Sequence, residues 1–285
     1  MPAKRPQPRN ARLLLIGGAE DPDERNPHIL PHLVQMAGGR KARLVVCSAP
    51  SAEPEEKVDT YGKLFRRLGV AEVVGAPIAQ RNQADETALL AAVGRATAVF
   101  FTGGDQLRLS SLVAGTEFAE LIRTRLFENG LVVAGTSAGA AAAGSVMIIG
   151  GGAGGHTVRR ADVDLAPGLG YWRDSVVDTH FNQRGRVHRL MTIFAQNPQV
   201  LGIGLDEDTA VELQPGTGFR VLGSGAVMVF DGRVTHSNAA DVGDEAILAA
   251  TDSVLHVLPA GYGFDLQAMR PRLPSGELIP EKPHG

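Results

Sequence analysis

One serine lies in a run of small residues typical of a catalytic nucleophile. Residues 135–139 read Gly-Thr-Ser-Ala-Gly, which fits the pattern G-x-S-x-G around Ser137. An apolar stretch, residues 131–134, comes directly before it, and an alanine-rich stretch, residues 138–143, follows. A strand, a sharp turn and a helix in this order form a nucleophile elbow, which exposes a serine hydroxyl at the carboxyl end of a sheet. The alternative is a turn whose small residues only pack a helix closely against a strand.

A serine nucleophile needs a base, and His180 is the best placed of the eight histidines. It follows the apolar residues 175–177, at the predicted end of a strand, where it would face the same sheet edge as Ser137. A group that orients the imidazole is also needed. Three carboxylates follow the apolar residues 201–205, namely Asp206, Glu207 and Asp208. The alternatives are a buried structural histidine and a solvated acidic turn.

Other polar groups of the predicted site are backbone amides and arginines. The N–H of Ala138 and those of residues 103–105 could bind the oxyanion of an acyl-transfer reaction. Three arginines closely follow His180 and could bind substrate carboxylates or pair with local acids: Arg184, Arg186 and Arg189. An ordinary basic helix start is the alternative.

The elements that position these residues alternate between strand and helix. Apolar runs at residues 13–16, 44–46, 73–74, 98–101 and 131–134 predict strands, and residues 53–68, 87–93 and 106–127 predict helices between them. This alternation predicts a parallel sheet covered by helices on both faces. Short runs at residues 210–213, 219–222, 227–230 and 254–258 predict an antiparallel extension of the same sheet. We expect a single domain over residues 11–270, with unstructured tails at 1–10 and 271–285.

Composition excludes several functional classes. The chain has 285 residues, 44% of them hydrophobic, and a net charge of -3, which argues against a general nucleic-acid binder. A single cysteine, Cys47, rules out an internal disulfide. The sequence shows no signal peptide and no apolar run that could cross a bilayer. We therefore expect a cytoplasmic protein that does not bind membranes.

No cofactor or metal is predicted. No spacing of histidine, cysteine and acidic residues indicates a metal site. Residues 150–155 read Gly-Gly-Gly-Ala-Gly-Gly, which formally fits a dinucleotide fingerprint. This run is expected to follow a helix rather than a strand and to open no helix of its own. We interpret it as a mobile loop over the pocket.

Five motifs together resemble the serine-peptidase family that contains the cyanophycinases and dipeptidase E. They are Phe-Thr-Gly-Gly-Asp-Gln at 101–106, Gly-Thr-Ser-Ala-Gly-Ala at 135–140, Pro-Gly-Leu-Gly at 167–170, Asp-Thr-His-Phe-Asn-Gln-Arg-Gly-Arg at 178–186, and Gly-Ile-Gly-Leu-Asp-Glu-Asp-Thr-Ala at 202–210. The resemblance implies a flavodoxin-like three-layer α/β sandwich, related to class I glutamine amidotransferases, and a homodimer.

The resemblance also implies roles for single residues. Ser137 would be the nucleophile, His180 the general acid and base, and Glu207 the orienting acid. Gly104 and Ala138 would form the oxyanion hole. The positions that would bind substrate are Asp105, Gln106, Asp178, Thr179, Arg184, Arg186, Arg189 and Asp208.

Cyanophycin is the substrate implied by the resemblance. It is a poly-aspartate with arginine on each β-carboxyl, and hydrolysis through an acyl-enzyme on Ser137 would release β-Asp-Arg dipeptides. The chain departs from the family at Thr179, where glutamine is common, and at Asp208, where asparagine is common. Two arginines at 159–160 could repel the arginines of cyanophycin. The alternatives are an aspartyl or isoaspartyl dipeptidase of the same family and a non-enzymatic peptide-binding homologue.

Overall fold

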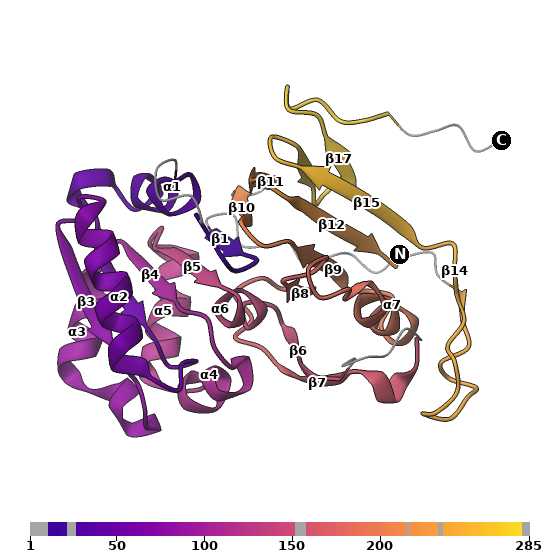
Figure 1. Ribbon diagram of the computed structural model, residues 1–285, viewed down its shortest axis with the longest axis horizontal. Coiled ribbons are helices and arrows are strands. Elements are labelled where there is room, and N and C mark those ends of the chain that lie inside the picture. Colours follow the sequence, from indigo (N-terminus) through magenta and orange to yellow (C-terminus); the bar gives the residue numbers. More distant parts are fainter. Residues whose placement is uncertain (1–10, 22–26, 152–157, 215–216, 233–235, 281–285) are drawn as a thin grey trace.

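A nine-stranded sheet forms the centre of the computed structural model, which describes residues 11–21, 27–151, 158–214, 217–232 and 236–280 (Figure 1). The strand order is β17-β16-β11-β10-β1-β5-β4-β2-β3. The parallel strands are β1 (Arg12–Ile16), β2 (Arg43–Cys47), β3 (Glu72–Ala76), β4 (Ala98–Phe101) and β5 (Val132–Thr136). The antiparallel strands are β10 (Thr209–Gln214), β11 (Gly218–Gly223), β16 (Gly263–Asp265) and β17 (Arg270–Arg272).

Helices cover both faces of this sheet. Leu14 and Ile16 of β1 belong to one apolar cluster with α1 (Ile29–Met36) and α2 (Pro54–Arg67). Leu13 and Leu15 belong to the cluster on the other face. That face is covered by α3 (Thr87–Arg95), α4 (Gln106–Val113), α5 (Glu117–Glu128) and α6 (Ala138–Ala141). Because successive side chains of a strand point to opposite faces, the continuous apolar runs of the sequence serve both layers.

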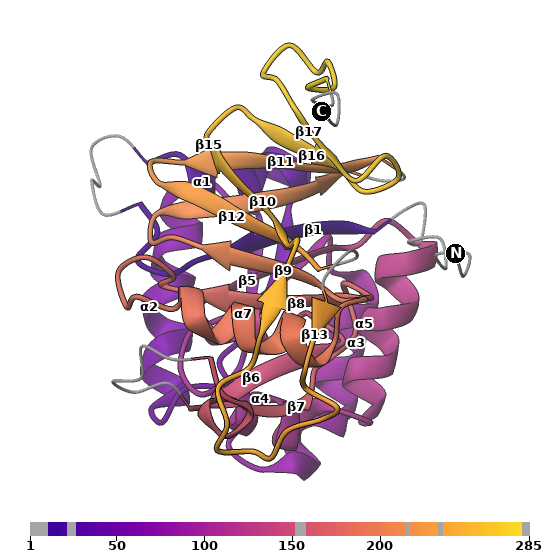
Figure 2. The ribbon, with the colours of Figure 1, turned by 90° about the vertical axis from the view of Figure 1, so that its right-hand side faces the viewer.

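A second sheet packs against the antiparallel part of the first. Its order is β15-β12-β9-β8, formed by β8 (Ser175–Thr179), β9 (Leu201–Leu205), β12 (Ala226–Asp231) and β15 (Val254–Pro259). Ile203 and Val229 of this sheet share one buried cluster with Leu15 and Val221 of the first. Helix α7 (Val187–Gln196) covers the outer side, and Figure 2 shows it in front of the second sheet.

Short elements complete the fold. Two hairpins are formed by β6 (Val146–Gly150) with β7 (Asp164–Pro167) and by β13 (His236–Ser237) with β14 (Ala250–Thr251). Single 3-10 turns lie at Gly39–Lys41, Arg81–Asp85 and Arg160–Asp162. Within the described ranges, no helix combines the length and the apolar character needed to cross a membrane.

The predicted fold class, a three-layer α/β sandwich with a mostly parallel sheet, is confirmed, and two predictions about single elements were wrong. Residues 227–230 and 254–258 do form strands, but β12 and β15 belong to the second sheet. The helix predicted over 106–127 is interrupted at Gly115, which has φ of 73°, and Thr116 caps the second half by accepting the Ala119 N–H. Period alone cannot reveal such a break, because the apolar face continues across it.

The structure bears on only one of the two predicted tails, the C-terminal one at residues 271–285. The C-terminal tail begins later than residue 271, because Arg270–Arg272 is strand β17 and the Ile279 N–H donates to the Pro271 carbonyl at 2.9 Å. The N-terminal tail, residues 1–10, lies outside the described residues.

The glycine run also needs a correction. Gly150 ends strand β6, so the run follows a strand and not the helix that we expected. The run was also expected to open no helix of its own. In the described residues the next element is the 3-10 turn Arg160–Asp162, and no α-helix begins there. Residues 152–157, the predicted loop over the pocket, lie outside the described residues.

Candidate active site

Ser137 lies in a strained turn between β5 and α6. Its φ of 52° and ψ of -111° fall in a region that residues with side chains rarely adopt. The turn closes only because its neighbours are glycine: a Cβ on Gly135 would lie 2.5 Å from the Gly139 carbonyl carbon. The N–H of Ser137 donates to the Ile16 carbonyl at 3.0 Å, which ties the turn to β1.

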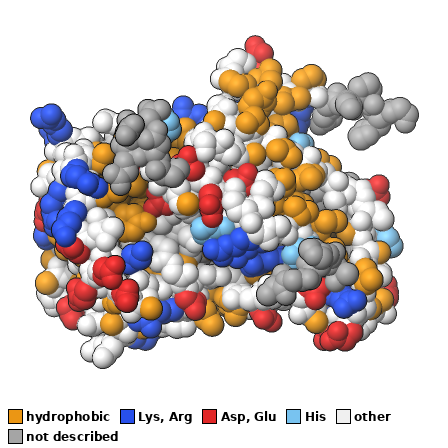
Figure 3. Space-filling view, viewed as in Figure 1, with side chains coloured by type: hydrophobic (Ala, Val, Ile, Leu, Met, Phe, Trp, Pro, Cys, Tyr) orange, Lys and Arg blue, Asp and Glu red, His pale blue; other side chains and the backbone are white. Residues whose placement is uncertain are grey.

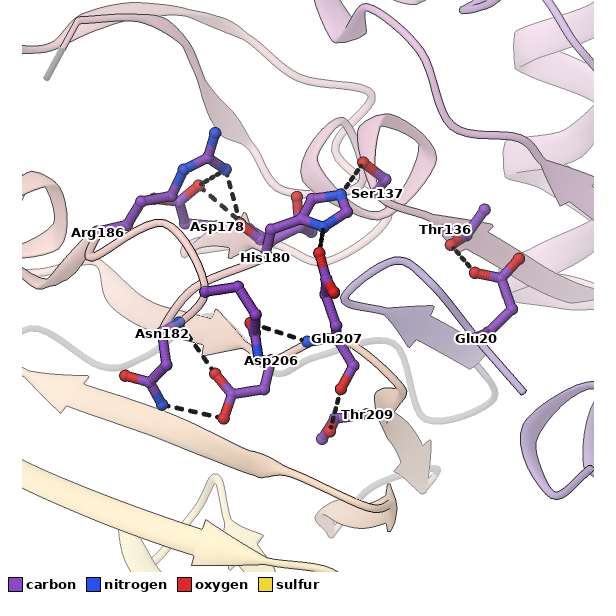
Figure 4. Close-up of polar contacts among 12 residues, drawn as sticks. Glu20, Thr136, Ser137, Asp178, His180, Asn182, Arg186, Asp206, Glu207 and Thr209 are labelled. Atoms are coloured by element: carbon purple, nitrogen blue, oxygen red, sulfur yellow. Dashed lines mark hydrogen bonds and ion pairs between the residues drawn. The ribbon is translucent and has the colours of Figure 1, made fainter. Parts of the chain in front are cut away.

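His180 reaches the serine from the second sheet. It directly follows β8, its φ is 49°, and its N–H donates to the Gly17 carbonyl at 2.9 Å. The imidazole Nε2 lies 2.8 Å from the Ser137 Oγ (Figure 4). A Cβ on Gly18 would lie only 2.3 Å from the imidazole Cε1, so the ring needs a glycine there. We had expected both groups on one parallel sheet, whereas the structure brings them together from two.

Of the three consecutive acids, Glu207 is the one that contacts the imidazole. Its Oε1 lies 2.6 Å from the His180 Nδ1, and its side chain is 37% exposed. Asp206 is buried and accepts the backbone N–H of Asn182 at 3.1 Å and of Ala226 at 3.2 Å. The Asp206 carboxylate therefore holds two backbone amides in place, whereas the Glu207 carboxylate contacts the His180 imidazole.

Asp208 is engaged away from the imidazole. Its carboxylate accepts the Asp21 N–H at 2.8 Å and the Ser224 hydroxyl at 2.7 Å. These two donors occupy both carboxylate oxygens. These contacts join the segments that carry Asp21 and Ser224 to Asp208.

The loop after β4 lies beside the serine. A Cβ on Gly103 would lie 3.4 Å from the Ser137 Cβ. Gly104 has φ of 144°, and a Cβ there would lie 2.2 Å from the Pro50 carbonyl oxygen, so the position excludes other residues. Within the described part of the chain, the amides of Gly104 and Ala138 donate to no backbone carbonyl.

Asp105 and Gln106 hold the start of α4. The Asp105 carboxylate caps the helix by accepting the Leu107 N–H at 2.7 Å and the Arg108 N–H at 3.1 Å. The Gln106 amide donates to the Ile148 carbonyl at 2.5 Å. Both side chains thus fix the loop that carries Gly104.

A buried acid and two arginines lie beside the imidazole. Arg186 donates to the Asp178 Oδ1 at 3.0 Å and to the Thr179 carbonyl at 2.6 Å, and the Arg189 Nε lies 3.4 Å from the Asp178 Oδ2. Burial raises the pKa of Asp178, while Arg189 and Arg186 oppose that rise. Burial also lowers the pKa of Arg186. Arg184 is exposed.

Charged side chains gather around the site. Figure 3 shows a group of Lys and Arg side chains beside a histidine and acidic side chains near the middle of one face.

Within the described ranges, no three His, Cys, Asp or Glu side chains are placed to hold a metal ion. Cys47 is fully buried, and burial raises its pKa to about 12, so the thiol stays protonated.

The sequence alone did not single out two groups that shape the site. The Gln183 Oε1 accepts the Glu207 N–H at 3.1 Å and so helps to hold this acid. Gly17 and Gly18 lie against the residues that follow β9 and against the imidazole. A glycine pair directly after the apolar residues 13–16 was a visible signal, since glycine permits close approach at a strand end.

Fold and comparisons together define an α/β peptidase. The crystal structure of a peptidase from an acI-B1 Actinobacterium superposes with a TM-score of 0.66 at 22% identity, covering 90% of this chain and 97% of that chain. At this identity the likeness shows the fold. The profile of Peptidase family S51 matches residues 13–221. The chain therefore belongs to peptidase family S51.

Its sequence relatives include cyanophycinases. The chain is 38% identical over 262 residues to the cyanophycinase of Trichormus variabilis, covering 92% of this chain and 87% of the relative. It is 39% identical over 256 residues to that of Synechococcus elongatus, covering 90% and 79%. The predicted peptidase of the cyanophycinase type is thereby confirmed.

Proposed function

We propose that the chain is a serine peptidase that hydrolyses cyanophycin to β-Asp-Arg dipeptides. The observation that carries the proposal is the line of contacts from the Ser137 Oγ through the His180 imidazole to the Glu207 carboxylate, at 2.8 Å and 2.6 Å. The three residues follow three separate strands, and two of them have strained backbones. Such strain persists where the surrounding structure over-determines it, which is typical of active sites.

In the proposed mechanism, His180 acts first as a base. Its Nε2 takes the Ser137 proton while the alkoxide attacks the peptide carbonyl. Glu207 accepts the Nδ1–H, holds the tautomer and stabilises the imidazolium that forms. The amides of Gly104 and Ala138 are proposed to bind the oxyanion. His180 then protonates the leaving amine, and water hydrolyses the acyl-enzyme by the same route.

The charges around the site support a substrate that carries carboxylates. In cyanophycin the arginine is joined through its amino group, so each unit keeps a free α-carboxylate and a free guanidinium. Arg184 is exposed, its N–H donates to the His180 carbonyl at 3.1 Å, and its side chain is proposed to bind the carboxylate. Arg186 and Arg189 are proposed to shape the pocket with Asp178 and Thr179.

Of the two arginines at 159–160, Arg160 has partners within the protein that compensate its charge. Its guanidinium lies 3.3 Å from the Asp244 carboxylate and also donates to the Ala239 carbonyl. These contacts hold the Arg160 guanidinium at the hairpin formed by β13 and β14. The repulsion considered from the sequence therefore has no support at this position.

An aspartyl dipeptidase of the same family is the second candidate. It is favoured by Thr179, which is buried and too short to offer the amide that is common in the family. A panel of cyanophycin, β-Asp-Arg, α-Asp-X and isoaspartyl-X peptides separates the two candidates. We expect release of β-Asp-Arg from cyanophycin. Turnover of dipeptides alone would favour the second candidate.

We further propose a homodimer and a cytoplasmic location. Strand β15 is an edge of the second sheet and exposes apolar side chains at Val254, Leu255 and Val257. An exposed apolar edge strand supports pairing with another chain. Light scattering coupled to size exclusion tests the dimer, and cell fractionation tests the location.

A further inference from the structure

The short segment after β1 connects all the strand ends of the candidate site. We call residues 17–21 the β1 turn. Three of its residues have positive φ: Gly18 at 103°, Ala19 at 47° and Asp21 at 50°. For the two that carry side chains this conformation is strained, and it persists only where other contacts hold it.

Backbone bonds join this region to each part of the proposed triad. The bonds are Ser137 N–H to the Ile16 carbonyl at 3.0 Å, His180 N–H to the Gly17 carbonyl at 2.9 Å, and Asp208 N–H to the Gly18 carbonyl at 2.9 Å. The last of these lies directly next to Glu207. A shift of the β1 turn would therefore move the acceptors of His180 and Asp208 directly, and it would also pull on the end of β1 that holds Ser137.

Glu20 fastens the β1 turn to the rest of the molecule. Its Oε2 accepts the Thr136 hydroxyl at 2.5 Å, and its Oε1 accepts the Tyr61 hydroxyl at 2.6 Å. Thr136 is the last residue of β5 and directly precedes Ser137 (Figure 4). Tyr61 lies on α2 and packs on Phe100 with ring centroids 4.9 Å apart. Burial raises the pKa of Tyr61, and the nearby Glu20 carboxylate adds to that rise, so this hydroxyl stays a donor.

The two bonds restrain the turn from two directions. Thr136 belongs to the main sheet, and Tyr61 belongs to the helix layer that covers it. Hydrogen bonds to a charged acceptor are stronger than those between neutral groups. Glu20 therefore couples the strained turn to the strand that leads into the nucleophile elbow.

We propose that Glu20 is a positioning residue that holds the nucleophile and its base in register. The inference rests on the proposed function of Ser137 and His180. Glu20 is assigned no contact with the substrate. Its removal should lower the rate of every step that uses the serine, because a displacement of about 1 Å between reacting groups can reduce a rate by about 100-fold.

The test uses the full chain and two readouts. The first is kcat and KM for peptide hydrolysis. The second is the rate at which diisopropyl fluorophosphate, which is small and uncharged, modifies Ser137. In that reaction the serine oxygen bonds to phosphorus, fluoride leaves, and the serine proton passes to His180. We expect Glu20→Ala to lower kcat and the labelling rate together by about 10- to 100-fold, with KM within about twofold.

Conservative variants separate positioning from folding. Glu20→Gln keeps one acceptor and adds a donor that either hydroxyl can accept, so it should recover most of the rate. Thr136→Val removes one of the two bonds and should give a smaller loss than Glu20→Ala. The matched control is Glu212→Ala on β10. The Glu212 carboxylate also contacts two side chains, His32 at 3.1 Å and Arg220 at 2.8 Å, and Ser137 of this variant should be labelled at the wild-type rate.

The outcomes separate this inference from the proposed function. If wild-type Ser137 is not labelled, the proposed function fails and the inference falls with it. If Ser137 is labelled but Glu20→Ala, folded by circular dichroism, keeps kcat and labelling within twofold, the inference alone is overturned. A rise in KM with unchanged kcat, or an equal loss in Glu212→Ala, would also overturn it. If Glu20→Ala does not fold, the same criteria apply to Thr136→Val.

Discussion

Two acid–base contacts lie at the end of β8, and they differ mainly in their access to water. Glu207 is 37% exposed and contacts the His180 imidazole at 2.6 Å. Asp178 is 3% exposed and contacts Arg186 at 3.0 Å and Arg189 at 3.4 Å. Both are carboxylates within hydrogen-bond distance of a basic side chain, yet the first faces the reacting group and the second lies inside the protein.

This difference predicts different consequences of substitution. A partly exposed carboxylate with a single side-chain contact contributes little to folding. A buried carboxylate with two arginines is different, because its loss leaves two cations without their partner. We therefore expect substitutions in the row Ser137–His180–Glu207 to change rate, and substitutions in the cluster Asp178–Arg186–Arg189 to change stability first.

The largest effect is expected at the two reacting groups. Ser137→Ala and His180→Ala should each lower kcat by about 10⁵-fold or more, because members of a triad act as a unit. The free energy of unfolding of Ser137→Ala should stay within about 0.5 kcal/mol of wild type, since only one partly buried hydroxyl is removed. Hydrolysis assays and urea denaturation measure both. Retained turnover in Ser137→Ala would remove the nucleophile from the account.

Neighbouring acids give the next comparison. Glu207→Gln should lower kcat by about 10²- to 10⁴-fold, because the imidazole loses the partner that sets its tautomer, with little change in stability. Asp206→Asn should instead lower the free energy of unfolding by about 2 kcal/mol, because the buried Asp206 carboxylate is the acceptor of two partly buried backbone amides. Equal effects of the two substitutions on both quantities would show that exposure does not separate their roles.

The buried cluster should respond through folding. Asp178→Asn leaves Arg186 and Arg189 without a counter-charge, and we expect a loss of about 3 kcal/mol in the free energy of unfolding. Arg184→Ala, on the exposed arginine of the same segment, is the control and should leave stability unchanged while raising KM. An Asp178→Asn protein as stable as wild type would contradict the distinction between the two regions.

The smallest effect is expected at a carboxylate of intermediate exposure. Glu212 is 18% exposed, and its hydrogen bond to His32 lowers its pKa, with a further contribution from Arg220. Because the pKa is lowered in the folded state, the stabilisation is present above the unfolded pKa and is lost as pH falls through the folded pKa. As pH falls through the folded pKa of Glu212, the free energy of unfolding of wild type should decrease by about 0.5–1 kcal/mol more than that of Glu212→Gln. Urea denaturation at several acid pH values would measure it, and a constant difference would contradict the assignment.

The sequence predicted the nine-stranded half of the molecule better than the rest. Continuous apolar runs are typical of buried parallel strands, and β1, β2, β4 and β5 all contain one, followed within two residues by glycine or serine. The second sheet was missed because short strands near residues 227–230 and 254–258 carry no information about which sheet they join. Partner choice depends on packing between distant segments, as between Ile203 and Val229.

The contacts of the site were also only partly predictable. The spacing around Ser137 indicated an elbow, because only small residues allow so sharp a turn. Residue type alone could not decide which of three adjacent acids faces the imidazole. The family resemblance implied Glu207, and the structure places Asp206 and Asp208 against other groups. Glu20 gave no local signal at all, since its partners Thr136 and Tyr61 lie 116 and 41 residues away.

Mass spectrometry of the protein after reaction with diisopropyl fluorophosphate is the most direct test of the nucleophile. We expect a single phosphoryl adduct on the peptide that contains Ser137, formed rapidly in wild type and at least about 100-fold more slowly in His180→Ala. Labelling of another serine, or equal labelling of Ser137 in both proteins, would contradict a serine that is activated by His180.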